Sequence, residues 1–219
     1  MCEKVPSLFC AKSIFDIDIS LKNGVNIDEE FHIWKETPFE YHCSQGNTDL
    51  VKHLVKNGCN VSINGFNNVC MYGWVDIFDF LVPLINVNDK GYFNRTPLIH
   101  ACKGGQVDIV KKLLDMNVSI METDTYDSAA IHYAAAAGCL EIIDLLIIYG
   151  VNLNTIVNTY DPHPPLHRAV RKKHYDIVKR LLEFNIDINQ IDCMSMTPRL
   201  IAMEIEDEIM IELLNAYGD

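Results

Sequence analysis

The sequence predicts an all-α fold in which similar helix pairs stack into a solenoid. The 219 residues are 49% hydrophobic and 22% charged, which suits a soluble chain with a buried core. Two apolar segments at helical spacing recur together along most of the chain. The copies of this pattern start at Thr37, Asn64, Thr96, Ala129, Pro164 and Thr197. Because no such unit can bury its apolar face alone, neighbouring units must stack.

The spacing of residues that recurs from unit to unit has physical reasons. Thr followed by Pro at three starts predicts an N-cap and a first helical residue. A glycine between the two segments predicts a left-handed turn, and an acidic residue just after it favours the positive end of the second helix. The glycines are Gly46, Gly73, Gly105 and Gly138. The apolar seam between units is predicted to contain Leu54, Leu81, Leu113, Leu146, Leu181 and Leu214.

We predict one continuous domain over residues 1–219. Residues 1–30 form an N-terminal capping unit, repeats start near residues 37, 64, 96, 129 and 164, and residues 197–219 form a C-terminal capping repeat. Two units depart from the pattern. The unit at Asn64 lacks Thr-Pro, and Pro83 should end its second helix early. The unit at Pro164 follows a longer loop and has Lys173 where glycine is usual.

The most apolar stretch, residues 131–150, has the length of a membrane-spanning helix. Glu141 and Asp144 lie near its middle, where an acidic residue costs roughly 2.5–3.5 kcal/mol on the insertion scale. Gly138 and Glu141 also match a helix end followed by a helix start. The stretch is therefore predicted to be two short helices of one repeat.

In these features the chain resembles the ankyrin-repeat family from about residue 3 to its C-terminus. The family's opening appears as Thr96-Pro97-Leu98 and as Pro165-Leu166-His167. The resemblance implies a turn and two antiparallel helices in each repeat, and protein–protein recognition without catalysis. It also implies that His132 and His167 form local hydrogen bonds that hold a loop. His42 and His100 fall at other positions of the repeat, where the pattern allows them to be exposed to solvent.

Composition and motifs argue against several other classes. A formal charge of −12 disfavours nucleic acid and anionic membranes as partners. The eight cysteines are irregularly spaced, which fits free thiols in a reducing compartment. Lys12 interrupts the only apolar run near the N-terminus that could form a signal-peptide core. We therefore expect the protein in the cytoplasm or nucleus. No catalytic motif or phosphate-binding loop is present. We predict no enzyme activity, no cofactor and no metal, and we expect a monomer.

Two groups of possible metal ligands have simpler explanations. Cys43, Cys70 and Cys102 occupy one equivalent position in three successive units, which predicts a core column of small side chains. Packed helices lie about 8–10 Å apart, too far for a disulfide. His163 and His167 are separated by two prolines within one short segment, which excludes helical ligand spacing.

The predicted partner surface is made of hairpin tips and the exposed face of the first helices. Each tip carries aromatic residues that the repeat itself does not require, and aromatic and arginine side chains dominate binding hot spots. Packing of each ring onto a neighbouring tip is the alternative. A basic group on one first helix suits an acidic peptide, or is simply a solvated face. The candidates are Phe31, Trp34, Tyr92, Phe93, Arg95, Tyr126, Tyr133, Tyr160, Arg168, Arg171 and Lys172.

The predicted function is therefore recognition of a partner protein. Three roles stay open at this point: a pathogen or viral factor that mimics a host ankyrin protein and sequesters a signalling protein, a cellular scaffold, and a subunit that recruits substrates to a larger enzyme. A composition rich in Ile and Asn and poor in Arg tilts the choice slightly toward the first.

Overall fold

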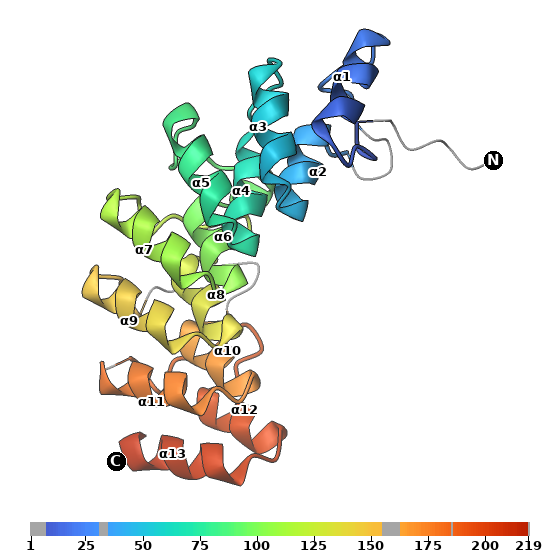
Figure 1. Cartoon of the computed structure of the whole chain (residues 1–219). Coiled ribbons are helices and arrows are strands. Elements are labelled where there is room, and N and C mark those ends of the chain that lie inside the picture. Colours follow the sequence, from blue (N-terminus) through green and yellow to red (C-terminus); the bar gives the residue numbers. More distant parts are fainter. Residues whose placement is uncertain (1–7, 31–34, 155–162, 185, 219) are drawn as a thin grey trace, which may run out of the picture.

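The computed structural model describes residues 8–30, 35–154, 163–184 and 186–218. Within these ranges the chain is helical and has no strand; an isolated bridge joins Thr123 to Ala129. Helix pairs follow one another in a curved row, with the first helices on one side and the second helices on the other (Figure 1). The all-α solenoid predicted from the sequence is confirmed.

The helices after α1 (Ile14–Lys22) form six pairs within the described ranges. Each pair begins within one residue of a predicted repeat start. The pairs are α2 (Pro38–Gln45) and α3 (Thr48–Lys56), α4 (Ile63–Tyr72) and α5 (Val75–Leu81), α6 (Pro97–Gly104) and α7 (Val107–Asp115), α8 (Ala130–Ala137) and α9 (Leu140–Ile148), α10 (Pro165–Arg171) and α11 (Tyr175–Glu183), and α12 (Pro198–Glu204) and α13 (Glu208–Gly218).

The helix ends follow the predicted signals. Thr37, Thr96 and Thr197 each accept a hydrogen bond from the backbone N–H three residues on, over 3.2–3.3 Å. The four predicted glycines end their helices in the left-handed region, with φ from +69° to +82°. Lys173 takes the same turn with φ +58°, at the steric cost that glycine avoids. Pro83 lies in a 3₁₀ turn, η1 (Val82–Leu84), directly after the short helix α5.

The core runs through the stack as columns of equivalent residues. All six leucines of the predicted seam are at most 2% exposed. Cys43, Cys70 and Cys102 are fully buried free thiols, and burial raises the pKa of each. The predicted cysteine column is therefore part of the core. The apolar stretch from Ile131 to Gly150 forms α8 and α9, and no helix in the part of the chain described here is long and apolar enough to cross a bilayer.

His42 is fully buried, so the exposure considered for it is wrong. Its Nε2 lies 2.7 Å from the carbonyl oxygen of Leu8, and its Nδ1 lies 3.0 Å from Nδ2 of Asn47. The segment that precedes α1 covers this part of α2 and removes it from solvent. His100 is half-buried.

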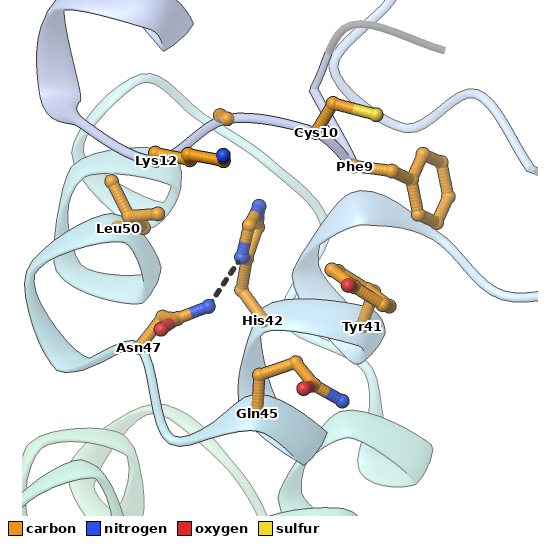
Figure 2. A pocket seen from close by; sticks show the side chains of 9 residues that line it. Phe9, Cys10, Lys12, Tyr41, His42, Gln45, Asn47 and Leu50 are labelled. Atoms are coloured by element: carbon orange, nitrogen blue, oxygen red, sulfur yellow. Dashed lines mark hydrogen bonds between the residues drawn. The ribbon is translucent and has the colours of Figure 1, made fainter. Parts of the chain in front are cut away.

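A hollow of about 580 Å³ lies between that N-terminal segment and the α2–α3 pair, and His42 stands at its centre (Figure 2). Lys12 and Cys10 approach from the N-terminal segment, and Asn47 approaches from the α2–α3 turn. Both ring nitrogens of His42 already have hydrogen-bond partners. The buried polar group of this hollow is thus satisfied by the chain itself and requires no ligand.

His132 has the local role that the family resemblance implied, whereas His167 contacts the tip of the following repeat. Nδ1 of His132 accepts the backbone N–H of Ala129 at 3.1 Å, and Nε2 of His167 lies 2.9 Å from the carbonyl oxygen of Met196. Both imidazoles are completely buried. Burial lowers the pKa of His132 to about 3 and of His100 to about 4, and also lowers the pKa of His42 and His167.

Mild acid is expected to destabilise the chain through these histidines. The unfolded chain binds protons near pH 6.5, whereas the folded chain keeps the buried imidazoles neutral to a lower pH. Stability is therefore complete above about pH 6.5 and falls as pH decreases below it, by up to about 1.4 kcal/mol per pH unit for each fully shifted histidine. Urea midpoints measured at about pH 7 and about pH 5 should differ accordingly. His132→Asn should reduce this difference, and equal midpoints at both pH values would contradict it.

Candidate functional site

A cluster at the tips of the third and fourth helix pairs is organised around Asp124. This carboxylate is buried, and its Oδ2 accepts hydrogen bonds from Nε of Arg95 at 3.0 Å and from the Tyr133 hydroxyl at 2.6 Å. Its Oδ1 accepts the backbone N–H groups of Tyr126 and Ser128 at 2.9 and 3.0 Å. The Arg95 guanidinium also donates to the Tyr133 hydroxyl at 2.9 Å, which closes a three-residue network.

The charges of this network stabilise one another. Burial alone would raise the pKa of Asp124, but the hydrogen bonds from Tyr133, Ser128, Tyr126 and Arg95 outweigh it and lower that pKa. Burial, together with the hydrogen bond to Asp124, raises the pKa of Tyr133 to about 12. At neutral pH the network therefore holds a paired carboxylate and guanidinium and a neutral phenol.

Two exposed rings stand on this network. Phe93, in the 3₁₀ turn η2 (Tyr92–Asn94), stacks on Tyr126 with ring centroids 6.3 Å apart. The Arg95 guanidinium lies 5.2 Å from the centre of the Phe93 ring and 6.0 Å from that of Tyr126. The carbonyl oxygen of Phe93 also accepts the backbone N–H of Thr125 at 2.9 Å. Phe93 is still 56% exposed and Tyr126 39% exposed, so tip-to-tip packing leaves much of both rings open to a partner.

The two arginines of the basic group expected on α10 contact side chains of neighbouring repeats. Arg171 lies 3.5 Å from Asp192 and 3.7 Å from Glu204. Arg168 donates to the carbonyl oxygen of His163 at 3.0 Å and to Ser128 Oγ at 2.5 Å, and it lies over the Tyr133 ring. Lys172 is exposed. The arginines thus connect repeats to one another, so an acidic peptide would have to compete with these contacts.

Family models describe the same repeated architecture. A model of three ankyrin repeats matches residues 66–157 and residues 131–219, and a model of a single ankyrin repeat matches residues 34–63. The chain belongs to the ankyrin-repeat family. Solenoids of this family present extended concave surfaces to other proteins, so the chain is a protein-interaction module.

Similar proteins come from several sources. The chain is 34% identical over 112 residues to putative ankyrin repeat protein FPV014 of fowlpox virus. This match covers 51% of this chain and 25% of that protein. The chain is 30% identical over 97 residues to probable E3 ubiquitin-protein ligase XBOS32 of Oryza sativa subsp. japonica, covering 43% of this chain and 19% of that protein. The human ASB11 ankyrin repeat domain superposes with a TM-score of 0.72 at 26% identity, covering 84% of this chain and 85% of that one. The chain therefore spans a quarter or less of both curated relatives.

The ankyrin stack brings together only part of the predicted site. Phe93, Arg95 and Tyr126 meet at adjacent tips, and Tyr92 lines a pocket beside Phe93. The Tyr133 ring, on helix α8, contacts both Arg95 and Arg168. The remaining aromatic candidates, Phe31, Trp34 and Tyr160, lie outside the described residues.

Sequence reasoning missed Asp124, although a signal for it exists. Asp124 and Asp192 each lie five residues before a repeat start, and each accepts two backbone N–H groups of its own tip with Oδ1. In both tips the second oxygen then faces a basic side chain, Arg95 or Arg171. An aspartate recurring at that spacing therefore predicts a tip that is held rigidly.

A second missed feature is a small pocket of about 160 Å³ beside Tyr92 and Phe93. Glu36 from the segment before α2, Asn67 from α4 and His100 from α6 contribute to its walls. These residues have unrelated positions in their repeats, so no periodic signal in the sequence connects them. The described part of the chain contains no cluster of three or more His, Cys, Asp or Glu residues suited to a metal ion.

Proposed function

We propose that this ankyrin-repeat chain captures a partner protein through its hairpin tips and the concave face of its first helices, in the cytoplasm or nucleus. The observation that carries the proposal is the cluster of Phe93, Tyr126 and Arg95. The rings of Phe93 and Tyr126 are exposed, and Asp124 holds Arg95 and the backbone of Tyr126 in place. A preorganised aromatic surface loses little conformational entropy on binding. Residues 1–219 act as one unit in this proposal, with residues 1–30 and 197–219 as its caps.

The wider role of the chain rests on its relatives. Similarity to a fowlpox virus protein supports a viral or pathogen factor that sequesters a host signalling protein. Similarity to a probable E3 ubiquitin-protein ligase supports the second candidate, a module that recruits substrates to a larger enzyme. Ubiquitylation of the captured partner in cells that express the chain would favour the second role, and unmodified retention of the partner would favour the first.

Replacing Tyr92 and Phe93 with alanine is expected to weaken partner capture at least about tenfold, since a single hot-spot truncation costs about 2 kcal/mol or more. Both side chains are more than half exposed, so the thermal midpoint should hardly change. The partner is first identified by crosslinking and mass spectrometry on the unmodified chain, and its affinity is then measured for each variant.

Ile148→Ala is the matched control, because Ile148 is 76% exposed but lies on the second helix α9, away from the tips. It should keep full affinity. Equal affinity of the Tyr92 and Phe93 double variant and the unmodified chain would reject the tip surface, and a collapsed melt would assign both rings to packing.

A further inference from the structure

Two residues that line the pocket beside Tyr92, Asn67 and His100, each have a buried polar atom without a partner. Oδ1 of Asn67 and Nδ1 of His100 have no hydrogen bond to any residue that the structure describes. Asn67 is only 2% exposed, and its Nδ2 donates to the carbonyl oxygen of Arg95 at 3.3 Å, which fixes the orientation of the amide. An unsatisfied buried polar group costs about 1–3 kcal/mol. A ligand that brought N–H donors into the pocket would recover this energy.

The pocket is also negatively charged. Glu40 is buried and already accepts hydrogen bonds from the Ser62 hydroxyl at 2.7 Å and the Thr37 N–H at 3.2 Å. Glu36 forms no ion pair with any of the described residues, and burial together with the nearby charge of Glu40 raises its pKa. A cation close to Glu36 would relieve both effects.

The basic groups at the pocket do not make it a site for anions. Arg95 is committed to Asp124 at 3.0 Å. His100 is neutral at pH 7, because burial and the nearby Arg95 lower its pKa to about 4. Neutral imidazole leaves one ring nitrogen as an acceptor. The pocket thus offers a carboxylate, an amide oxygen and a ring nitrogen, all of which accept protons in hydrogen bonds.

We propose that this pocket receives the side chain of an arginine from the partner protein. The guanidinium carries five N–H donors in a planar fork, which suits several separated acceptors, and its flat face suits the exposed ring of Tyr92. Glu36 supplies the opposite charge, and Asn67 and His100 supply the remaining acceptors. An ammonium group would supply three donors from a single point and would match this arrangement less well.

The pocket volume agrees with such an occupant. About 160 Å³ corresponds to several water molecules at roughly 30 Å³ each in the liquid, enough for the head of one long side chain. The inference rests on the proposed function, since the arginine belongs to the captured protein. It also reverses the charge expected from the sequence, where the residues around Arg168 suggested an acidic peptide.

Binding of a minimal probe tests the proposal directly. N-acetyl-arginine amide, titrated into the full ¹⁵N-labelled chain, is expected to bind with a dissociation constant on the order of 1 mM, as a single-residue ligand would. It should shift the side-chain amide signals of Asn67 and the backbone signal of Tyr92. N-acetyl-citrulline amide has nearly the same shape without the charge and should bind at least about tenfold more weakly. Equal binding of both probes, or stronger binding of N-acetyl-glutamate amide, would overturn the proposal.

Glu36→Gln provides the matched variant, because it removes the charge and keeps the shape of the side chain. We expect it to weaken arginine-probe binding at least about fivefold. Glu141→Gln removes an exposed acid from the first turn of α9 and should leave binding unchanged. Unchanged binding in Glu36→Gln, with a preserved spectrum, would also overturn the proposal.

Different results would reject the arginine pocket and the tip surface. If the arginine probe does not bind while the Tyr92 and Phe93 double variant still loses the partner, the arginine pocket is wrong and the tip surface stands. If the probe binds but that variant keeps the partner, the tip surface is wrong and the pocket takes arginine without serving partner capture.

Discussion

Leu146→Ala is expected to lower the free energy of unfolding by about 2–5 kcal/mol, the range found for large-to-small substitutions in packed cores. Leu146 is fully buried in α9 and belongs to the leucine column that passes through every helix pair. Its neighbours in the column, Leu113 and Leu181, come from the preceding and following repeats. The truncation therefore loosens two interfaces at once.

The size of this effect depends on the one-dimensional nature of the stack. In a solenoid each repeat contacts only its neighbours, so stability is close to a sum of repeat and interface terms. A cavity at Leu146 weakens the contacts of α9 with α7 and with α11. No distant part of the fold can close over it, and we expect a loss in the upper half of the range.

Urea unfolding followed by circular dichroism measures this loss, with Ile148→Ala as the control on the same helix. Ile148 points to solvent, so its truncation should change stability by less than about 0.5 kcal/mol. If Leu146→Ala proved as mild as the control, the repeat register would be wrong.

The register itself could be predicted because it rests on local and repeated chemistry. An N-cap threonine, a glycine with positive φ and a leucine at fixed spacing each depend on contacts within one repeat. Because these signals recur from repeat to repeat, the register is predicted several times over. The exceptions can be located for the same reason: Lys173 occupies the turn position of its repeat with positive φ, and Pro83 lies directly after the shortened helix α5. Even the cysteine column followed from equivalence of position alone.

The site was less predictable because its contacts join different repeats at non-equivalent positions. Arg95 reaches Asp124 on the next tip, and Arg171 reaches Asp192, so charges that look free in the sequence are paired in the fold. His42 was missed because the segment that buries it belongs to no repeat. Such contacts depend on how loops of unequal length approach each other, and a period in the sequence carries no information about that.

Gly104 shows the same limit at the interface between two repeats. It ends α6, next to the predicted turn residue Gly105, and only Gly105 has the positive φ that requires glycine. A Cβ built on Gly104 would collide with the backbone carbonyl oxygen of Met71 in α4. Equivalent positions in the other repeats carry side chains: Gln45, Tyr72, Ala137, Lys172 and Ile205.

Gly104→Ala is therefore expected to destabilise the chain by about 1–3 kcal/mol, as overpacking does, even though alanine is the better helix former. The colliding atom belongs to a helix backbone, which cannot move aside as a flexible side chain could. Gly105→Ala serves as the comparison, since its Cβ would meet nothing within 4 Å and only the backbone strain of about 1–2 kcal/mol remains.

The two variants also differ in what they should do beyond stability. Gly104→Ala should move α6 away from α4, and those helices carry His100 and Asn67, which both line the arginine pocket. It should weaken binding of the arginine probe, whereas Gly105→Ala, whose strain stays within its own turn, should not. Chemical denaturation and probe titration on the same samples measure both effects. A Gly104→Ala chain as stable as the unmodified one, with full probe binding, would mean that α4 and α6 are not held as closely as the structure places them.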